Sequence, residues 1–301
     1  MQYYPILKTH FTDLSHRSYS YKMSTWTDYE DKASTRYDKT RIAAGVELLE
    51  GTIRHHSPVP FEQSHVLALS CGTGNYEKVL LDAGIGHITC TDASLAMLSQ
   101  AKLKLENSRA DFKQVVLPKI SYEDEKFDVV TYFMALHHVL KYDEDSGEVT
   151  DWSPAQKIFD EAYRCLKKGG IFIFNWSTRD QLFSYYYGHL VPEAMVKGSK
   201  RFTDIEDMLE WGEKANFEVV SKFKIIDPLQ HGYYDYEKSA KSEDFWYQDS
   251  VLSGKDAEAE LPEARKILQE KLANGTWADW CKQHCKVDTI GSAVQICFRK
   301  K

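Results

Sequence analysis

The chain has 301 residues, of which 38 are basic and 45 acidic, so its formal net charge is −7. Hydrophobic residues make up 43% of the chain and charged residues 28%, values that exclude an intrinsically disordered protein. The acidic balance argues against a nucleic-acid partner, because contact with the phosphate backbone needs clustered lysine and arginine. No run of about 18 apolar residues occurs, so we expect no membrane-spanning helix and no membrane partner.

Residues 1–32 are expected to form an N-terminal extension. Residues 1–22 lack the apolar run of a secretory signal and carry three basic residues with one acid, Asp13. Two interpretations stay open: a transit peptide that is removed, or an extension that stays on the protein. The six scattered cysteines indicate reduced thiols, so we expect a cytoplasmic protein.

Strands and helices alternate through the middle of the chain, after a first helix predicted over residues 40–51 and ended by Gly51. Short apolar runs predict strands over residues 65–70, 87–91, 112–116, 127–133 and 171–176. Helices are predicted between them, over residues 75–83, 94–107 and 153–166, with Ser94 and Ser153 as N-caps and Gly169 and Gly170 as the final stop. This alternation predicts a parallel sheet with helices on both faces.

The pattern is less regular after residue 177. A helix over residues 205–215 and strands over 217–226 and 293–298 are predicted. Residues 227–288 are aromatic and charged, and we expect them to form an insertion that covers the substrate pocket. The expected domain plan is residues 1–32 as the extension, 33–226 as the core with a lid segment, 227–288 as the insertion and 289–301 as the last core strand.

A glycine-rich turn, Ser70-Cys71-Gly72-Thr73-Gly74, directly follows the first strand and opens a helix. Glycines let such a turn approach a ligand closely, and the amides at the helix start attract negative charge. Asp92 lies eighteen residues beyond Gly74, at the end of the second strand. An acid near that spacing accepts hydrogen bonds from ribose hydroxyls. The pair therefore predicts a nucleoside-binding site at the carboxyl edge of the sheet.

Five segments together resemble the class I S-adenosylmethionine-dependent methyltransferases, and within them the small-molecule branch: ASTRYDKTR, LALSCGTGNY, TDASLAML, EKFDVVTYFMALHHV and FDEAYRCLKKGGIFIF. The resemblance implies a Rossmann-like, doubly wound, mostly parallel seven-stranded sheet with an antiparallel last strand and an insertion before it. It also implies S-adenosylmethionine as the cofactor and methyl transfer to an N, O or S atom of a small molecule, such as an aromatic compound or an amine. We expect a monomer or a homodimer.

The resemblance also implies roles for individual positions. Asp92 would hold the ribose hydroxyls, the loop glycines would pass under the methionine part, and Arg41 would be available to the cofactor carboxylate. Ala93 and Met97 would touch the adenine. The implied cofactor site comprises Tyr37, Arg41, Ser70, Cys71, Gly72, Gly74, Tyr76, Asp92, Ala93, Met97, Val116, Leu117, Phe133 and Met134, of which the last two would face the sulfonium and the substrate.

Two positions depart from the pattern of this superfamily. Ala68 stands where an acid usually precedes the loop, and Val116 stands near the adenine where another acid is often found. These departures leave a second interpretation open, a non-catalytic methyltransferase-fold protein that serves as a partner subunit or sensor. A protein substrate is a third.

His137 and His138 follow the fourth strand and are the candidate catalytic residues, because an imidazole near neutral pKa can take a proton from the acceptor. Packing at the start of a helix is the alternative role. Aromatic residues that could form a wall of the substrate pocket are Trp176, Tyr186, Tyr233, Tyr234 and Trp246, and the alternative is that they form the core of the insertion. Cys281, His284 and Cys285 lack a fourth ligand, so no metal site is expected.

Overall fold

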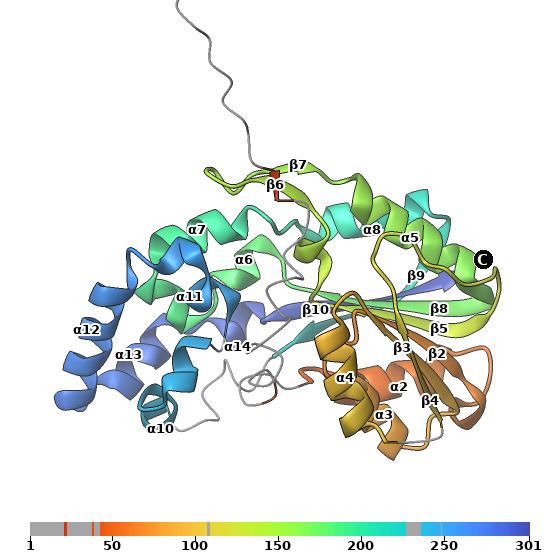
Figure 1. The fold of residues 1–301 in the computed structure, drawn as a ribbon, viewed down its shortest axis with the longest axis horizontal. Helices are drawn as coiled ribbons and strands as arrows, with labels where there is room; N and C mark the ends of the chain where they lie inside the picture. The colour runs from red at the N-terminus through yellow and green to blue at the C-terminus, as the bar shows by residue number, and fades with distance from the viewer. Residues whose placement is uncertain (1–20, 23–37, 39–42, 107–108, 227–235, 248) are drawn as a thin grey trace, which may run out of the picture.

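The computed structural model describes residues 21–22, 38, 43–106, 109–226, 236–247 and 249–301. It shows a sheet with helices on both faces and a helical lobe beside it (Figure 1). The chain reaches the lobe twice, once before and once after the strand at residues 217–225. The lobe and the sheet meet next to the site described below.

The central sheet has seven strands: β2 (His65–Leu69), β3 (His87–Asp92), β4 (Ala110–Gln114), β5 (Phe127–Phe133), β8 (Leu166–Trp176), β9 (Phe217–Ile225) and β10 (Ala293–Lys300). Their order across the sheet is β4-β3-β2-β5-β8-β10-β9. The pairs from β4 to β8 are parallel, and β10 runs antiparallel to both of its neighbours. The predicted doubly wound sheet with an antiparallel last strand is confirmed. Its order reverses between β2 and β5, which is where such sheets bind ligands.

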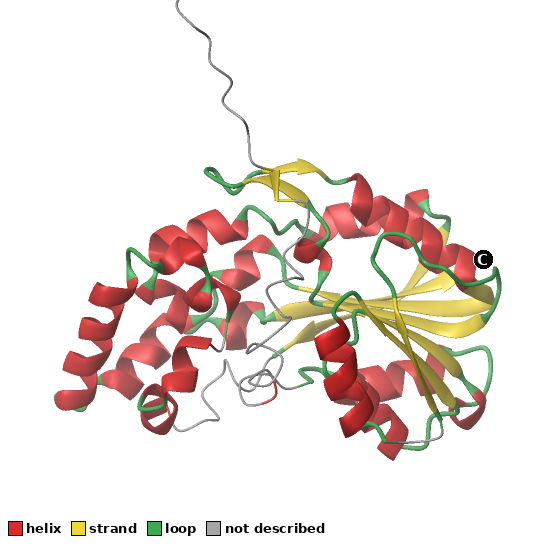
Figure 2. Ribbon diagram, viewed as in Figure 1, coloured by secondary structure: helices red, strands yellow, loops and turns green. Residues whose placement is uncertain are grey.

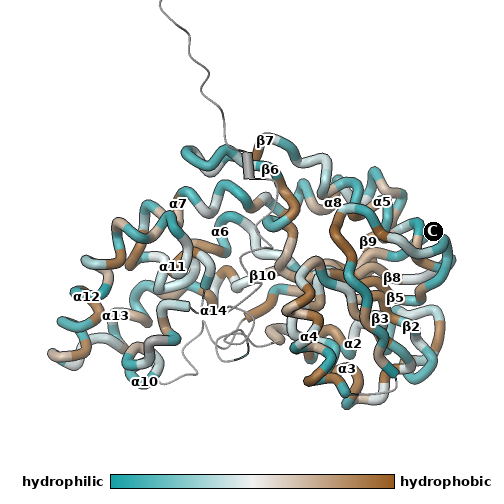
Figure 3. The backbone as a smooth tube through the Cα atoms, viewed as in Figure 1, coloured by the Kyte–Doolittle hydropathy of each residue, from teal (hydrophilic) through white to brown (hydrophobic). Residues whose placement is uncertain are grey.

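Helices cover both faces of the sheet, as Figure 2 shows. One face carries α2 (Val46–His56), α3 (Asn75–Asp82) and α4 (Leu95–Lys104), and the other carries α5 (Ser153–Cys165) and α8 (Ile205–Lys214). Hydrophobic stretches follow the strands and the helix sides that pack on them (Figure 3). One core joins Leu49 and Ile53 to the sheet, and the other joins Phe159 to Phe172 and Phe298. Burial of each such side chain contributes roughly 1.5–3 kcal/mol.

The first helix differs from its prediction. Helix α2 begins at Val46 and continues through Gly51 to His56, so the prediction that Gly51 ends it is wrong. A Cβ at Gly51 would meet no atom within 4 Å, which places this glycine toward solvent. Leu49 and Ile53 are fully buried on the other side of the helix. Their packing outweighs the cost of about 1 kcal/mol for a glycine inside a helix.

The junction between α5 and β8 also differs. The helix stops at Cys165, and β8 starts at the next residue and runs through the two glycines that were predicted only to end the helix. Gly169 has a φ of 76°, and a Cβ on Gly170 would lie 3.0 Å from the Asp128 carbonyl oxygen of β5. The glycines therefore bend the strand against its neighbour. Ser153 makes no cap, whereas the predicted cap at Ser94 is confirmed because its Oγ accepts the Met97 amide at 3.1 Å.

The helical lobe comes from two parts of the chain. The first supplies α6 (Arg179–Leu182), the 3-10 turn η4 (Tyr186–Leu190) and α7 (Pro192–Ser199). The second supplies α10 (Tyr236–Ala240), η5 (Glu243–Tyr247), α11 (Ser250–Ser253), η6 (Lys255–Ala257), α12 (Leu261–Ala273), α13 (Trp277–His284) and α14 (Val287–Ile290). Its core is continuous with the core on the α5 face of the sheet. Among the helices of the described residues, none combines the length and apolar content that crossing a bilayer requires.

Short elements complete the fold. The 3-10 turns η2 (Phe61–Gln63) and η3 (Leu136–His138) precede β2 and follow β5. The strands β6 (Lys141–Asp143) and β7 (Val149–Asp151) form a hairpin, and β1 (Tyr21–Lys22) pairs with β6. This small sheet stands between η3 and α5, above one end of the central sheet (Figure 1).

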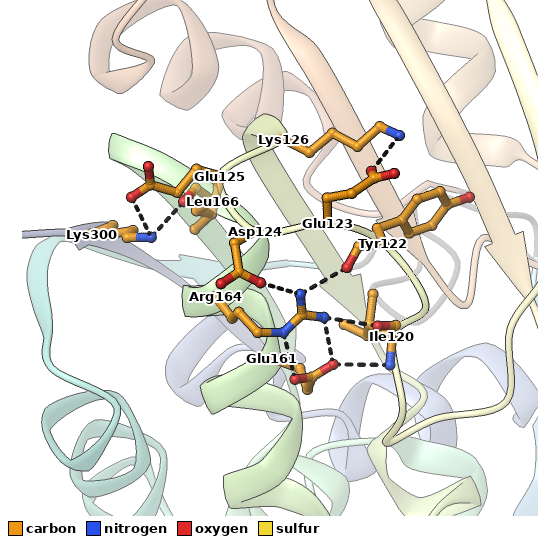
Figure 4. A network of polar contacts seen from close by, with 10 residues as sticks. All are labelled: Ile120, Tyr122, Glu123, Asp124, Glu125, Lys126, Glu161, Arg164, Leu166 and Lys300. Carbon is orange, nitrogen blue, oxygen red and sulfur yellow. Dashed lines mark hydrogen bonds and ion pairs between the residues drawn. The ribbon is translucent and has the colours of Figure 1, made fainter.

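Arg164, in the last turn of α5, fastens the segment that leads from β4 to β5 (Figure 4). Its guanidinium donates to the carbonyl oxygens of Ile120 and Tyr122 at 2.9 and 2.8 Å and to Asp124 at 2.7 Å. It also pairs with Glu161 at 2.8 Å, and these two acids raise the pKa of Arg164. The fastened segment directly follows residues 115–118, which form one wall of the site below.

Replacing Arg164 with methionine is expected to lower the free energy of unfolding by about 1–3 kcal/mol, because two carbonyls and two acids lose a charged donor. Urea denaturation followed by circular dichroism measures the loss. Lys126→Met is the control, since Lys126 pairs with the exposed Glu123 in the same region and should cost less than about 1 kcal/mol. Equal losses in the two variants would contradict the role given to Arg164.

Candidate active site

A cavity of about 550 Å³ lies at the carboxyl ends of the parallel strands. Leu69, Asp92, Phe133 and Asn175, which stand at or next to the ends of β2, β3, β5 and β8, all line it. This is the edge at which doubly wound sheets bind ligands, because helix N-termini and loops converge there. The volume is in the range of small-molecule pockets.

The turn after β2 passes along the cavity floor with three residues at positive φ: Ser70 at 54°, Gly72 at 57° and Gly74 at 82°. The Cys71 amide donates to the Thr91 carbonyl at 2.8 Å, which ties the turn to β3. A Cβ at Gly72 would meet nothing within 4 Å, so the space above this residue is open to a ligand. A Cβ at Gly74 would lie 2.8 Å from Leu105 Cδ1, so that glycine serves the packing of α3 on α4.

The Asp92 carboxylate is held in place by backbone amides. Its Oδ2 accepts the Gly72 amide and its Oδ1 accepts the Ser94 amide, both at 2.9 Å. A carboxylate oxygen can accept more than one hydrogen bond. The acid therefore stands at the cavity wall, already oriented, beside the open space above Gly72.

Apolar side chains flank this acid. Met97 is 4% exposed, and Leu117 is 9% exposed, whereas Val116 is 51% exposed. All three line the cavity together with Ala93. Two apolar walls with an acid between them suit a flat base joined to a sugar.

A contact of the N-terminal segment reaches the glycine turn. Asp38 Oδ2 lies 2.7 Å from Lys104 Nζ, and the Thr73 hydroxyl donates to Asp38 Oδ1. Lys104 Nζ also donates to Thr73 and to Asn75. Tyr37 and Arg41, the predicted lid residues on either side of Asp38, lie outside the described residues. Asp38 shows that this segment is in contact with the turn.

The same cavity extends to the residues that follow β5, beyond Phe133 and Met134. His137 and His138 line it, with ring centroids 3.8 Å apart. The His137 ring also stacks on Phe202 at 5.4 Å. Tyr185 completes the aromatic part of the lining. The cavity therefore offers imidazole and phenol groups in addition to Asp92 and the glycine turn.

Part of the chain matches a known family of domains. Residues 67–174 match the family of methyltransferase domains. The chain carries a methyltransferase domain. The matched residues hold the glycine turn, Asp92 and the two histidines, and their fold is that of class I S-adenosylmethionine-dependent methyltransferases. No curated protein matches the chain.

Solved structures share the fold of this methyltransferase domain at low sequence identity. A protein from Anabaena variabilis, described as a methyltransferase from an antibiotic biosynthesis pathway, is 16% identical with a TM-score of 0.65, and the match covers 87% of this chain and 99% of that one. A chain from the Haloferax volcanii complex of the Trm112 methyltransferase activator with a methyltransferase is 14% identical (TM-score 0.55, coverage 92% and 98%). Haemonchus contortus phosphoethanolamine N-methyltransferase 2, in complex with phosphomonomethylethanolamine and S-adenosylhomocysteine, is 16% identical (TM-score 0.55, coverage 91% and 58%).

The structure brings most of the predicted cofactor residues to one cavity of the methyltransferase domain. Those that line it are Ser70, Cys71, Gly72, Tyr76, Asp92, Ala93, Met97, Val116, Leu117, Phe133 and Met134. Gly74 does not line it, because its neighbours are Leu105 and Ala101 of the α4 region. A hydrogen bond with Cys90 and burial raise the pKa of Cys71, so this thiol stays protonated at neutral pH.

The predicted substrate residues, unlike most of the cofactor residues, do not line the cavity where the structure describes them. Trp176, Tyr186 and Trp246 do not line the cavity, so their positions give the substrate prediction no support. Trp176 is fully buried and stacks on Phe202 at 4.6 Å. Tyr186 packs against other lobe aromatics, and the Arg265 guanidinium lies 4.5 Å from the Trp246 ring centroid. Tyr233 and Tyr234 lie outside the described residues.

Several residues that line the cavity were not among the predicted site residues: Glu77, Asn175, Tyr185, Phe202 and Asp249. Glu77 had a readable signal, because it shares the buried face of α3 with Leu80 and Leu81, three and four residues on. An acid on the buried face of a helix needs a hydrogen-bond or ion-pair partner, because burial of an unpaired charge is unfavourable. Tyr185 had no such signal, since nothing in three consecutive tyrosines distinguishes the one that faces a cavity.

Proposed function

We propose that the protein transfers a methyl group from S-adenosylmethionine to an N, O or S atom of a small molecule, such as an amine or an aromatic compound. The main support for this proposal is that the glycine turn, Asp92, His137 and His138 all line one cavity. In this proposal residues 33–226 with the last strand are the catalytic core. Asp249, Ser250 and Val251 are the part of the 227–288 insertion that lines the cavity within the described residues, and they cover the substrate.

The residues present fit the cofactor. Asp92 would accept hydrogen bonds from the ribose hydroxyls, Gly72 leaves room for the ligand above the turn, and Met97 and Val116 would flank the adenine. S-adenosylmethionine, when bound, supplies the electrophilic methyl group. Ala68 is fully surrounded by the core below the turn, so no acid acts from that position.

The side chains around Phe133 and Met134 would align the acceptor with the methyl group. Methyl transfer from a sulfonium depends mainly on alignment of the reacting atoms, about 3 Å apart. Because the cavity wall is aromatic and polar there, it would hold a small ring or an amine. His137 or His138 takes the proton that the acceptor atom loses as it gains the methyl group.

Calorimetric titration with S-adenosylmethionine and S-adenosylhomocysteine tests the cofactor half of the proposal. We expect micromolar binding of both ligands. Incubation with S-adenosylmethionine and a panel of amines and phenols, followed by detection of S-adenosylhomocysteine, tests the transfer. Absence of binding at millimolar ligand would overturn the proposal and favour the non-catalytic partner subunit or sensor.

A further inference from the structure

Glu77 is a buried carboxylate in the wall of the cavity. It stands in the first turn of α3, three residues after Gly74, and is 3% exposed. Its Oε2 has no hydrogen-bond partner among the described residues. A buried carboxylate oxygen without a partner is costly, because nothing in the interior replaces the hydration that this oxygen loses. Glu77 therefore stands where a cationic ligand group would relieve that cost.

The charges around Glu77 do not neutralise it. Burial is the main cause that raises the pKa of Glu77 to about 7. The charge of Asp92 also raises it, whereas a hydrogen bond with the backbone of Glu77 and the charge of Lys104 lower it. Lys104 is engaged elsewhere, since its ammonium lies 2.7 Å from Asp38 and donates to Asn75. The Cys71 thiol of the turn, whose pKa is raised in part by the charge of Glu77, is protonated at neutral pH. Among the described residues, no basic side chain forms an ion pair with Glu77.

The other acids of the cavity have backbone partners. The two Asp92 oxygens accept amides of the turn and of α4, Asp151 accepts the Ser153 amide, and Asp249 accepts the Val251 amide. Glu77 differs from them in having a buried carboxylate oxygen, Oε2, without a hydrogen-bond partner in the described residues. It also belongs to the helix that the glycine turn opens, on the cofactor side of the cavity rather than the histidine side.

We infer that Glu77 recognises the positively charged amino group of the methionine part of S-adenosylmethionine. The inference rests on the proposed function. It adds that Glu77 is the residue that selects the charged amino group at the methionine end of the cofactor. The ammonium would be the positively charged partner of the buried carboxylate, and Asp92 would hold the ribose. Glu77 thus gives the chain an acid for this site although position 68 is alanine.

A panel of three ligands separates this role from others. S-adenosylmethionine carries an ammonium and a sulfonium, S-adenosylhomocysteine carries the ammonium alone, and 5′-methylthioadenosine carries neither. Calorimetry compares the wild type with Glu77→Gln, which keeps the size of the side chain and removes its charge. We expect Glu77→Gln to weaken the first two ligands by about 10- to 100-fold and to leave the third within about two-fold.

Asp82→Asn is the matched control, because Asp82 lies on the same helix, is exposed and pairs with Lys78. This variant should bind all three ligands as the wild type does. Equal weakening of the three ligands by Glu77→Gln would assign Glu77 a structural role and overturn the inference. Weakening of S-adenosylmethionine alone would assign it to the sulfonium and also overturn it. A wild type that binds none of the ligands would instead overturn the proposed function.

Proton release supplies an independent readout. At about pH 6.5 the ligand amino group is charged and Glu77 is largely protonated, so binding of the ammonium should lower the pKa of Glu77 and expel a proton. Titration of S-adenosylhomocysteine in buffers of different ionisation enthalpy measures the release. We expect release from the wild type and from Asp82→Asn, and none from Glu77→Gln. Equal release from all three proteins would contradict the role of Glu77.

Discussion

Asp92→Ala is expected to raise the Kd for S-adenosylmethionine by at least about ten-fold. Both Asp92 oxygens lie at the cavity wall, oriented by the Gly72 and Ser94 amides at 2.9 Å. A carboxylate fixed in this way accepts a ribose hydroxyl without further ordering, and each hydrogen bond to a charged group contributes roughly 1.5–3 kcal/mol. Loss of even one such bond therefore accounts for a ten-fold change.

The substitution also removes the acceptor of the two amides, so the glycine turn loses an anchor. Asp92→Asn keeps one oxygen acceptor and is expected to bind with intermediate affinity. Asp111→Ala serves as the control, because Asp111 lies on the adjacent strand β4, is exposed and pairs with His87 away from the cavity. Calorimetry gives the three Kd values. Unchanged affinity in Asp92→Ala would remove Asp92 from the cofactor site.

The inner strands of the sheet were predictable because they are buried on both faces and therefore form short, continuous apolar runs. The strand over residues 127–133 has the bounds that its run of Phe, Val, Tyr and Phe predicts. Asp92 was predictable for a related reason: its distance from the glycine turn is fixed by one helix and one strand. Local sequence thus determines both the sheet and the acid at its edge.

Other features depend on contacts that local sequence does not contain. Helix α2 continues past Gly51 because Leu49 and Ile53 pack against the sheet and outweigh the glycine. Trp176 at the end of β8 looked like a pocket residue, but Phe202, which is 26 residues later in the chain, stacks over it. Phe202 takes its place in the cavity lining. Tertiary packing determines which of the two aromatic side chains lines the cavity, and the periodicity of the sequence does not predict it.

The two glycines of the turn, to which sequence reasoning gave one role, are expected to respond differently to alanine. At Gly74, with a φ of 82°, the added methyl would lie 2.8 Å from Leu105 Cδ1. Backbone strain of about 1 kcal/mol and overpacking of about 1–3 kcal/mol should together lower the free energy of unfolding by about 2–4 kcal/mol. At Gly72 the methyl meets nothing within 4 Å, so only the strain of about 1 kcal/mol remains.

The effects on ligand binding should have the opposite order: in folded protein, Gly72→Ala should weaken binding more than Gly74→Ala. Gly72→Ala places its methyl in the open space above the turn, where the ligand would lie, and is expected to raise the Kd for S-adenosylmethionine by about ten-fold or more. Urea denaturation and calorimetry measure the two effects. A double-mutant cycle tests the cause at Gly74: Leu105→Ala should relieve the overpacking and give a coupling energy of about 1 kcal/mol or more with Gly74→Ala, and none with Gly72→Ala. Only Gly74 has Leu105 within contact of an added methyl group, so equal coupling at both glycines would contradict this explanation. It would mean instead that the turn responds as one strained unit.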